Sequence, residues 1–243
     1  MIPVYYDLHI HTALSPCAND DMTPNDIVGM ALLNGLDMIA VTDHNTMSNA
    51  NAIIKAAKAA QAQTDKELIV LPGIEVSTAE EVHVLCLFHD IGSALGFEKE
   101  LDPYFSTLAN RTDIFGHQIL YDEHDNSVGE IERMLIAPAT ITFDDLYDLT
   151  HNHGGAFIPA HIDRSSFSVI SNLGFLPPHL NISTIEISSL GVENGFYEQN
   201  KELYSKHKMI YSSDAHQLWD INEKKNCLQL PRRSAKAAIE YLR

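Results

Sequence analysis

Two histidines, His9 and His11, end an apolar stretch near the start of the chain, in YYDLHIHT. The β-forming side chains of residues 2–10 predict a strand. Side chains two residues apart on a strand point to the same face, so both imidazoles can face one way. Two imidazoles on one face can bind a single metal ion. This pair therefore predicts a metal site if other donors reach the same place.

Further donors occupy comparable positions along the chain. They are His44 in AVTDHN, Glu75 in PGIEVS, His83 in EVHVLCLF, His161 in IPAHID, and Asp214 and His216 in SSDAH. A mixture of imidazoles and carboxylates suits Zn, Mn or Fe better than Ca or Mg. Because one ion takes about four ligands, so many donors predict two or three divalent ions, with Glu75 placed to bridge.

The elements that must position these donors alternate between strand and helix. Strands are predicted at 2–10, 36–42, 67–77, 81–88, 156–162, 183–189 and 207–213. Helices are predicted at 24–33, 49–63, 94–110 with a break at Pro103, 130–137, 141–155 and 232–243. Strand–helix alternation predicts parallel βαβ units and an α/β barrel. In such barrels the chemistry lies at the carboxyl ends of the strands, so the donors should converge on one rim.

The order of the motifs resembles the PHP family, named for polymerase and histidinol phosphatase. The segments that carry the resemblance are DLHIHT, VTDHN, GIEVS, PAHID and SSDAH, and they extend from Asp7 to His216. The resemblance implies a distorted seven-stranded (β/α) barrel of the TIM-like PHP type. It also implies a site for three metal ions and hydrolysis of a phosphoester.

The resemblance also implies a role for each donor. His9 and His11 would bind a first ion with Glu75 and Asp214. Glu75 would bridge to a second ion held by His83 and His161, and His44 and His216 would hold a third. The family adds one more ligand in the loop after the first pair, which here reads SPCANDD. We expect Asp20 or its neighbour Asp21 in this role, with Cys17 as the alternative.

The implied mechanism is attack on phosphorus by a hydroxide bound between two ions, which would also neutralise the phosphoryl oxygens. Arg164 follows PAHID directly and could bind a non-bridging oxygen through its planar fork, with Arg111 as a second candidate. Asp7 and Asp43 lie close to ligand histidines in the sequence. We expect them to accept hydrogen bonds that orient the ligand rings, and we place Asp43 with Arg164 among the catalytic residues.

Length, composition and charge limit the domain number, the cellular compartment and the substrate class that we expect. We expect one domain over residues 1–243, with an irregular insertion at about 93–138. No apolar run is long enough to span a membrane, and the three widely spaced cysteines fit a reducing cytoplasm. The net charge is −17, whereas a nucleic-acid binder normally carries a basic face that neutralises phosphates. We therefore expect a small phosphorylated substrate, such as histidinol phosphate, a nucleotide or a short oligonucleotide end, and no extended nucleic-acid surface. The sequence leaves the oligomeric state open.

Two other functions remain as alternatives. A metal-dependent amidohydrolase or deaminase also begins with HxH in a β/α barrel. Such enzymes typically end with a lone catalytic Asp and often bridge their ions with a modified lysine, whereas this chain offers DAH and Glu75. A catalytically inactive metal-bound scaffold should lack some ligands, and nearly all of them are present here.

Overall fold

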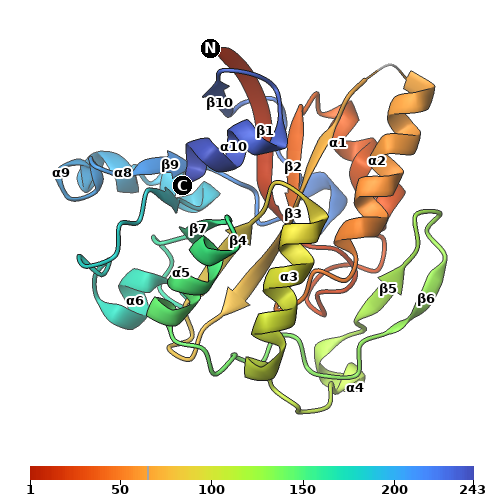
Figure 1. Ribbon diagram of the computed structural model, residues 1–243, viewed down its shortest axis with the longest axis horizontal. Helices are drawn as coiled ribbons and strands as arrows, with labels where there is room; N and C mark the ends of the chain where they lie inside the picture. The colour runs from red at the N-terminus through yellow and green to blue at the C-terminus, as the bar shows by residue number, and fades with distance from the viewer. Residues whose placement is uncertain (65) are drawn as a thin grey trace.

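A curled β-sheet lies at the centre of the molecule (Figure 1). The computed structural model of the chain describes residues 1–64 and 66–243. Six strands form the sheet in the order β10-β1-β2-β3-β4-β7. Their bounds are β1 (Ile2–Ile10), β2 (Met38–Val41), β3 (Ile69–Ser77), β4 (His83–Leu87), β7 (Ala156–Pro159) and β10 (Cys227–Leu230). The strands β1, β2 and β3 are parallel, whereas β4 is antiparallel to both β3 and β7, and β10 is antiparallel to β1.

A separate parallel pair, β8 (Thr184–Glu186) and β9 (Lys208–Ile210), extends the curve of the sheet beyond β7. The N–H of Ile162 donates to the carbonyl of Glu186 on one side of this pair. On the other side, the chain after β9 returns to β1, where Ala215 forms a parallel bridge with Ile10. The result is a half-barrel with a strand pair across its opening.

The seven predicted strands are all present, but their arrangement differs from a seven-stranded barrel. They are divided between the six-stranded sheet and the β8–β9 pair, and β10 is an additional strand. The prediction of parallel units throughout is wrong at β4, because residues 78–82 join β3 to β4 without a helix. A connection this short permits only an antiparallel neighbour.

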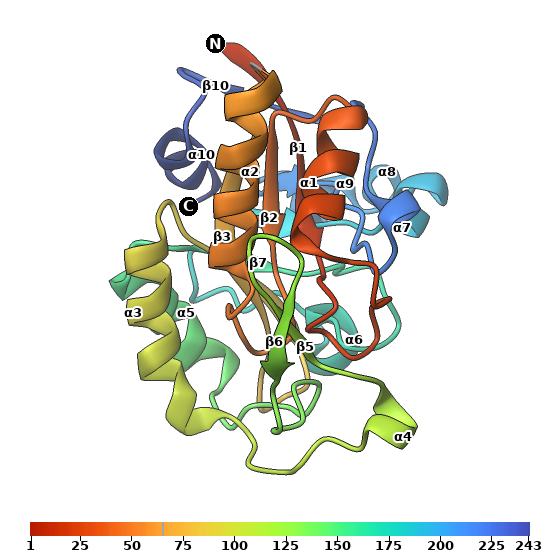
Figure 2. The same cartoon turned by 90° about the vertical axis from the view of Figure 1, so that its right-hand side faces the viewer.

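The longer helices pack outside the sheet (Figure 2). They are α1 (Pro24–Leu33), α2 (Ala50–Thr64), α3 (Ile91–Leu101), α5 (Phe143–Asn152) and α10 (Ala235–Leu242). Polar side chains cap most of their N-termini: Thr23 accepts from Asp26, Thr142 from Asp145 and Ser234 from Ala237. The predicted bounds lie within three residues of the observed ones for α1, α2, α5 and α10. The helix predicted at 94–110 instead spans Ile91–Leu101, and residues 105–110 form no helix. None of the helices among the described residues is both long and apolar enough to cross a membrane.

The segment at 93–138 is built from short elements. After α3 come a 3-10 turn (Asp102–Tyr104), α4 (Thr112–Phe115) and a hairpin of β5 (Ile119–Tyr121) and β6 (Ser127–Glu130). The helix predicted at 130–137 does not form. Instead, the Gln118 side chain donates to the carbonyls of Ile131 and Arg133 and accepts from the N–H of Leu135. A segment of eight residues without a cap forms only a marginal helix, so the hydrogen bonds from Gln118 to its backbone are favoured over helical ones.

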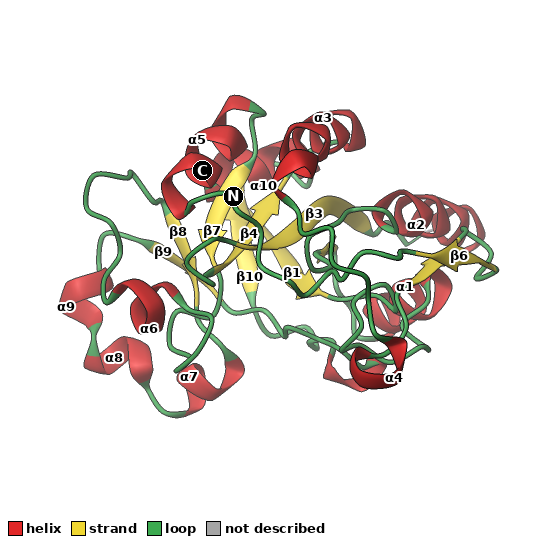
Figure 3. Ribbon diagram, turned by 90° about the horizontal axis from the view of Figure 1, so that it is seen from below, coloured by secondary structure: helices red, strands yellow, loops and turns green. Residues whose placement is uncertain are grey.

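Four short helices follow β7 and β8. They are α6 (Val169–Leu173), α7 (Ser189–Glu193), α8 (Phe196–Gln199) and α9 (Lys201–Tyr204). Figure 3 shows them on one side of the sheet, with α1, α2 and α4 on the other. The aromatic core lies between α3, α5 and the sheet, where Phe88 packs on Phe97 and Phe143 on Phe157. The ends of the sheet strands are therefore held by apolar packing on both flanks.

Candidate metal centre

The donors predicted from the sequence meet at one rim of the half-barrel. His9 lies at the end of β1 with His11 just beyond it, and His44 lies just after β2. Glu75 lies two residues before the end of β3. His83 reaches the same rim from the opposite direction. It is the first residue of the antiparallel β4 and pairs with Ser77, the last residue of β3. The antiparallel turn that the sequence analysis missed is thus what delivers His83.

One group of donors contains both histidines of the opening motif. The Nε2 atoms of His9 and His11 are 3.2 Å apart. The Oδ1 atom of Asp214 lies 3.2 Å from the first of these nitrogens and 3.1 Å from the second. The Glu75 oxygens lie 3.3 Å and 3.4 Å from the same two nitrogens. These donors form a compact set on one side of Glu75.

Glu75 is the centre of the cluster. Its side chain is 1% exposed, and five imidazoles surround it. Besides His9 and His11, it contacts Nδ1 of His83 at 3.0 Å and Nε2 of His161 at 3.2 Å through Oε1. It also contacts Nδ1 of His44 at 3.0 Å through Oε2. A carboxylate with donors on both oxygens is suited to bridging two ions.

A further group joins His11, His44 and His216, whose nitrogens lie within 4.8 Å of one another. The rings of His11 and His216 stack with centroids 4.2 Å apart. Cys17 is exposed, and its thiol is one of the groups that raise the pKa of His44. Asp20 and Asp21 are both exposed. The backbone carbonyl of Asp20 accepts from the hydroxyl of Tyr121.

The structure therefore brings together eight of the nine predicted metal donors and leaves Asp20 outside the donor groups that it describes. Those eight are His9, His11, His44, Glu75, His83, His161, Asp214 and His216. Cys17, like Asp20 and Asp21, is exposed and lies outside these donor groups, but its thiol contributes to the raised pKa of the His44 ring. The loop is anchored on both sides of this thiol, because Ser15 accepts from the His44 N–H and Asn19 donates to the His216 carbonyl.

Glu186, which the sequence analysis did not select, supports the cluster from behind. Its Oε2 atom lies 2.9 Å from Nδ1 of His9 and accepts from the backbone N–H of His161 at 3.1 Å. Accepting the Nδ1 proton of His9 leaves its Nε2 lone pair free for a cation. The sequence did contain a pattern that could have identified Glu186. In STIEISS a glutamate lies within an apolar strand, as Glu75 does in GIEVS.

His11 is held by a relay through Ser15 and Asp43. The Ser15 hydroxyl donates to Asp43 at 2.7 Å, so its oxygen must accept from the His44 N–H and from Nδ1 of His11 at 2.9 Å. The Nε2 atom of His11 is therefore the one left for a cation. Asp43 also accepts from the N–H and hydroxyl of Thr12. Asp43 thus orients a donor through Ser15 rather than touching one.

Asp7 and the two arginines occupy different positions. Asp7 is buried and accepts from the N–H groups of Ser213 and Asn222, so it positions the loop that carries Asp214 rather than a ring. Arg164 lies at the rim, 43% exposed, with Nη1 2.7 Å from Oδ2 of Asp214. Arg111 is exposed and pairs with its neighbour Asp113.

Two donors are held in strained backbone. His161 has φ +29° and Asp214 has φ +55°, both in the left-handed region that side chains rarely adopt. Each such residue costs on the order of 1–3 kcal/mol and persists only where its surroundings impose it. Such strain is concentrated at functional sites.

The electrostatics of the cluster follow from packing imidazoles against buried carboxylates. Burial lowers the pKa of His11, but its contacts with Asp214 and Glu75 outweigh this and raise the pKa to about 9. Burial would raise the pKa of Glu75, yet the charges of His83, His9 and His44 hold it well below its usual value. Burial together with the charge of His11 lowers the pKa of His216 to about 3. The carboxylates are thus ionised and ready to bind cations.

The donor set fits divalent transition ions. Donors about 2.1 Å from one ion in tetrahedral geometry lie roughly 3.4 Å from each other. The separations among His9, His11, Asp214 and Glu75 are 3.1–3.4 Å. The Nδ1 atom of His161 and the Oε1 atom of Glu186 are buried without a hydrogen-bond partner in the described part of the chain. Imidazole nitrogen with carboxylate oxygen is the ligand chemistry of Zn, Mn and Fe.

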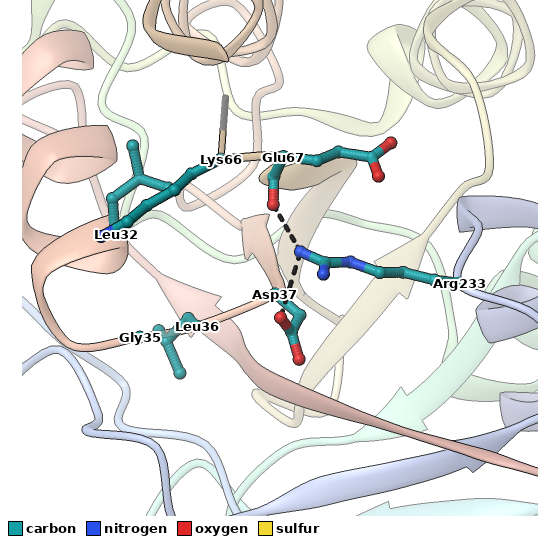
Figure 4. A pocket seen from close by; sticks show the side chains of 7 residues that line it. All are labelled: Leu32, Gly35, Leu36, Asp37, Lys66, Glu67 and Arg233. Atoms are coloured by element: carbon teal, nitrogen blue, oxygen red, sulfur yellow. Dashed lines mark hydrogen bonds and ion pairs between the residues drawn. The ribbon is translucent and has the colours of Figure 1, made fainter. Parts of the chain in front are cut away.

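Several cavities lie away from the metal donors. Figure 4 shows one of about 440 Å³ at the opposite end of the strands, where Asp37 precedes β2 and Glu67 precedes β3. Arg233 closes it by pairing with Asp37 and donating to the Glu67 carbonyl. Arg233 and Asp37 neutralise each other there, and none of the metal donors lines the cavity.

Comparison with known families identifies the class of protein. The PHP domain matches residues 7–173, which is more than half of the chain. This chain therefore belongs to the PHP family, as the order of its motifs predicted. The α/β, TIM-like fold class is confirmed as well, because solved structures of this fold superpose on almost the whole chain.

Particular relatives are nucleases. The 5′-3′ exoribonuclease Rnm of Salmonella typhimurium is 35% identical over 91 residues, covering 36% of this chain and 29% of that protein. Rnm of Escherichia coli is 34% identical over the same length. The matched part spans less than a third of these relatives. The lesion-specific endonuclease Q of Pyrococcus furiosus superposes with a TM-score of 0.72 at 16% identity, covering 99% of this chain and 56% of that one.

These relatives overturn the expectation of no extended nucleic-acid surface. A second endonuclease Q structure contains a 27-mer duplex with an abasic lesion at the active site. It superposes with a TM-score of 0.62 at 17% identity, covering 89% of this chain and 50% of that one. The expectation rested on the net charge of −17, which counts only the polypeptide. Bound cations are often the largest local charges in a site, so the charge of the chain alone was the wrong measure.

Proposed function

We propose that this protein is a metal-dependent phosphoesterase that hydrolyses the phosphoester of a nucleotide or of a nucleic-acid end. The observation that carries the proposal is the arrangement of donors around Glu75, where five imidazoles contact one buried carboxylate. Two or three divalent ions of Zn, Mn or Fe fit this arrangement. The family and its nuclease relatives support phosphate esters as the substrate class.

The donors are assigned to ions by their contacts. A first ion would be held by His9, His11, Asp214 and Glu75, and a second by Glu75, His83 and His161. A third would be held by His44 and His216, with His11 close by. Bound there, the cations would lower the pKa of a water molecule and neutralise the charge on the phosphoryl oxygens.

The residues of the chain itself orient the donors and the substrate. Glu186 holds the His9 ring with Nδ1 protonated, and the Ser15–Asp43 relay does the same for His11. Arg164 is placed to bind a non-bridging phosphoryl oxygen through the part of its fork that Asp214 leaves free. Its exposed position at the rim suits a residue that receives a substrate from solvent.

Cys17 is the best candidate for the additional ligand of the third group. Cys17 and Asp20 are both exposed, but Cys17 lies between the loop anchors at Ser15 and Asn19, and its thiol contributes to the raised pKa of His44. A thiolate ligand favours Zn over Mn because it is the softer donor. Cys17→Ser should therefore reduce zinc content while leaving manganese content nearly unchanged, and Asp20→Asn should change neither.

The proposal is tested by metal content and hydrolysis measured together. Purified protein should contain two or three divalent ions per chain by elemental analysis. With added manganese, it should release phosphate or nucleotide from 5′-phosphorylated oligonucleotides and from an aryl phosphate. His9→Ala should lose at least one ion and nearly all activity. The control is His117→Ala, an exposed histidine that pairs with Glu130. Full activity with unchanged metal content in His9→Ala would refute the assignment.

A further inference from the structure

The loop after β7 carries more than a metal donor. It begins at His161 and ends at Ser168, which caps α6. The N–H of Arg164 donates to the carbonyl of His161 at 2.9 Å, and the Ser168 hydroxyl donates to the carbonyl of Arg164 at 2.7 Å. These bonds fold the loop into consecutive turns, so that Arg164 and Phe167 stand on one short rigid segment at the rim.

Phe167 has an unusual combination of properties. Its backbone lies in the left-handed region, with φ +54°. Its side chain is large and apolar, yet the residue is 47% exposed. One face of the ring stacks on His83, with centroids 5.0 Å apart and planes inclined by 25°. The carbonyl of Phe167 also accepts from the N–H of His83 at 3.0 Å, which locks the residue in place.

Core packing does not account for this arrangement. A residue other than glycine in the left-handed region costs on the order of 1–3 kcal/mol, and a half-exposed ring recovers only part of its apolar burial. The strained backbone holds the ring against a metal donor while leaving part of its surface in solvent. A preformed aromatic surface beside a phosphate-binding group is what proteins use to stack a nucleobase.

We propose that Phe167 is the base-stacking residue of this site. It would stack the base of a terminal nucleotide whose phosphate lies at Arg164 and the metal donors. This inference rests on the proposed phosphoesterase function and specifies its substrate as a phosphoester that carries a nucleobase. Arg164 would then bind the phosphate of a nucleotide through its charge, and Phe167 would bind the base of the same nucleotide by stacking.

The test compares two substrates that differ only in the base. Adenosine 5′-monophosphate and ribose 5-phosphate present the same phosphoester, but only the first has a ring to stack. Phe167→Ala should lower kcat/KM for the nucleotide by at least about fivefold, the lower end of what base–aromatic stacking contributes. It should leave ribose 5-phosphate within about twofold. Phe167→Trp should retain the nucleotide activity. Phe175→Ala, which removes another exposed phenylalanine, is the matched control.

Two results would overturn the proposal. An equal loss on both substrates would mean that the ring only supports His83. No loss on the nucleotide would mean that the ring contacts no base. A binding measurement gives an independent readout, because 2-aminopurine fluorescence is quenched by stacking. A non-hydrolysable 2-aminopurine nucleoside 5′-phosphonate should be quenched on binding to the parent protein and not to Phe167→Ala. Equal quenching by both proteins would also contradict the proposal.

The same reagents separate this inference from the function on which it rests. If the parent protein hydrolyses neither substrate with zinc, manganese or iron, the phosphoesterase proposal fails, and the quenching experiment still decides the stacking. The source of the base is resolved by a 5′-phosphorylated tri-adenylate. A larger Phe167→Ala effect on the trinucleotide than on the mononucleotide identifies the end of a strand as the ligand, and the reverse identifies the free nucleotide.

Discussion

Glu186 offers the sharpest test of how the centre is held together. Its Oε2 atom receives two donors, Nδ1 of His9 at 2.9 Å and the N–H of His161 at 3.1 Å. Glu186→Gln keeps an acceptor for both donors and removes only the negative charge. Hydrogen bonds to charged groups contribute roughly 1 kcal/mol more than neutral ones, so two weakened bonds amount to about 2 kcal/mol. Residues behind metal ligands typically change metal affinity about 10- to 100-fold, which agrees with this figure.

The expected result is a selective loss of metal affinity. Glu186→Gln should bind its tightest divalent ion about 10- to 100-fold more weakly by calorimetric titration, and excess metal should restore much of the activity. Its unfolding temperature without metal should change little. Glu186→Ala leaves both donors unpaired in a buried site and should lower the free energy of unfolding by about 2–6 kcal/mol.

The control and the refuting result are both specific. Glu193→Gln removes the same charge from an exposed position seven residues further along and should have no effect on metal affinity. If Glu186→Gln binds metal as tightly as the parent protein, then the Glu186 carboxylate does not orient His9. The hydrogen bond at 2.9 Å would then be incidental to metal binding.

Three further predictions follow from the contacts. Arg164→Ala should raise KM for phosphoester substrates about tenfold or more while metal content stays unchanged, because its fork is exposed at the rim. Divalent ions at 100 times their Kd should raise the free energy of unfolding by about 2.7 kcal/mol per site in calorimetry or denaturant titration, and Glu75→Gln should abolish most of this gain. Gly191→Ala should lower that free energy by about 1–3 kcal/mol, since its Cβ would lie 2.5 Å from Oδ2 of Asp163; Gly29→Ala, in open space on α1, should not.

Much of the fold could be predicted because local patterns decide it. The strand at 2–10 and the helix at 49–63 follow from β-propensity and alanine-rich periodicity, and both formed close to the predicted bounds. The helix predicted at 130–137 failed because the Gln118 side chain, distant from it in sequence, satisfies its backbone. The direction of β4 was also missed, since strand patterns carry no information about which way a strand pairs.

The candidate site likewise has features that the sequence predicts and features that only the folded chain reveals. The types of His9, His11 and Glu75 and their places at strand ends predicted a shared rim from sequence alone. Cys17, Asp20 and Asp21 could not be ranked from the sequence, because the order of residues in a loop does not show where its path brings each side chain. Phe167 gave no signal in the sequence, since its backbone conformation and exposure are set by its neighbours.

The sequence by itself determined the kinds of donor, their order along the chain and the family. Side-chain chemistry and strand periodicity are local properties, so they can be read from adjacent residues. Only the tertiary structure decided which donors lie together, that Glu186 supports His9 and that Phe167 lies against His83. These contacts join residues up to 177 positions apart, and their distances depend on how the whole sheet curls.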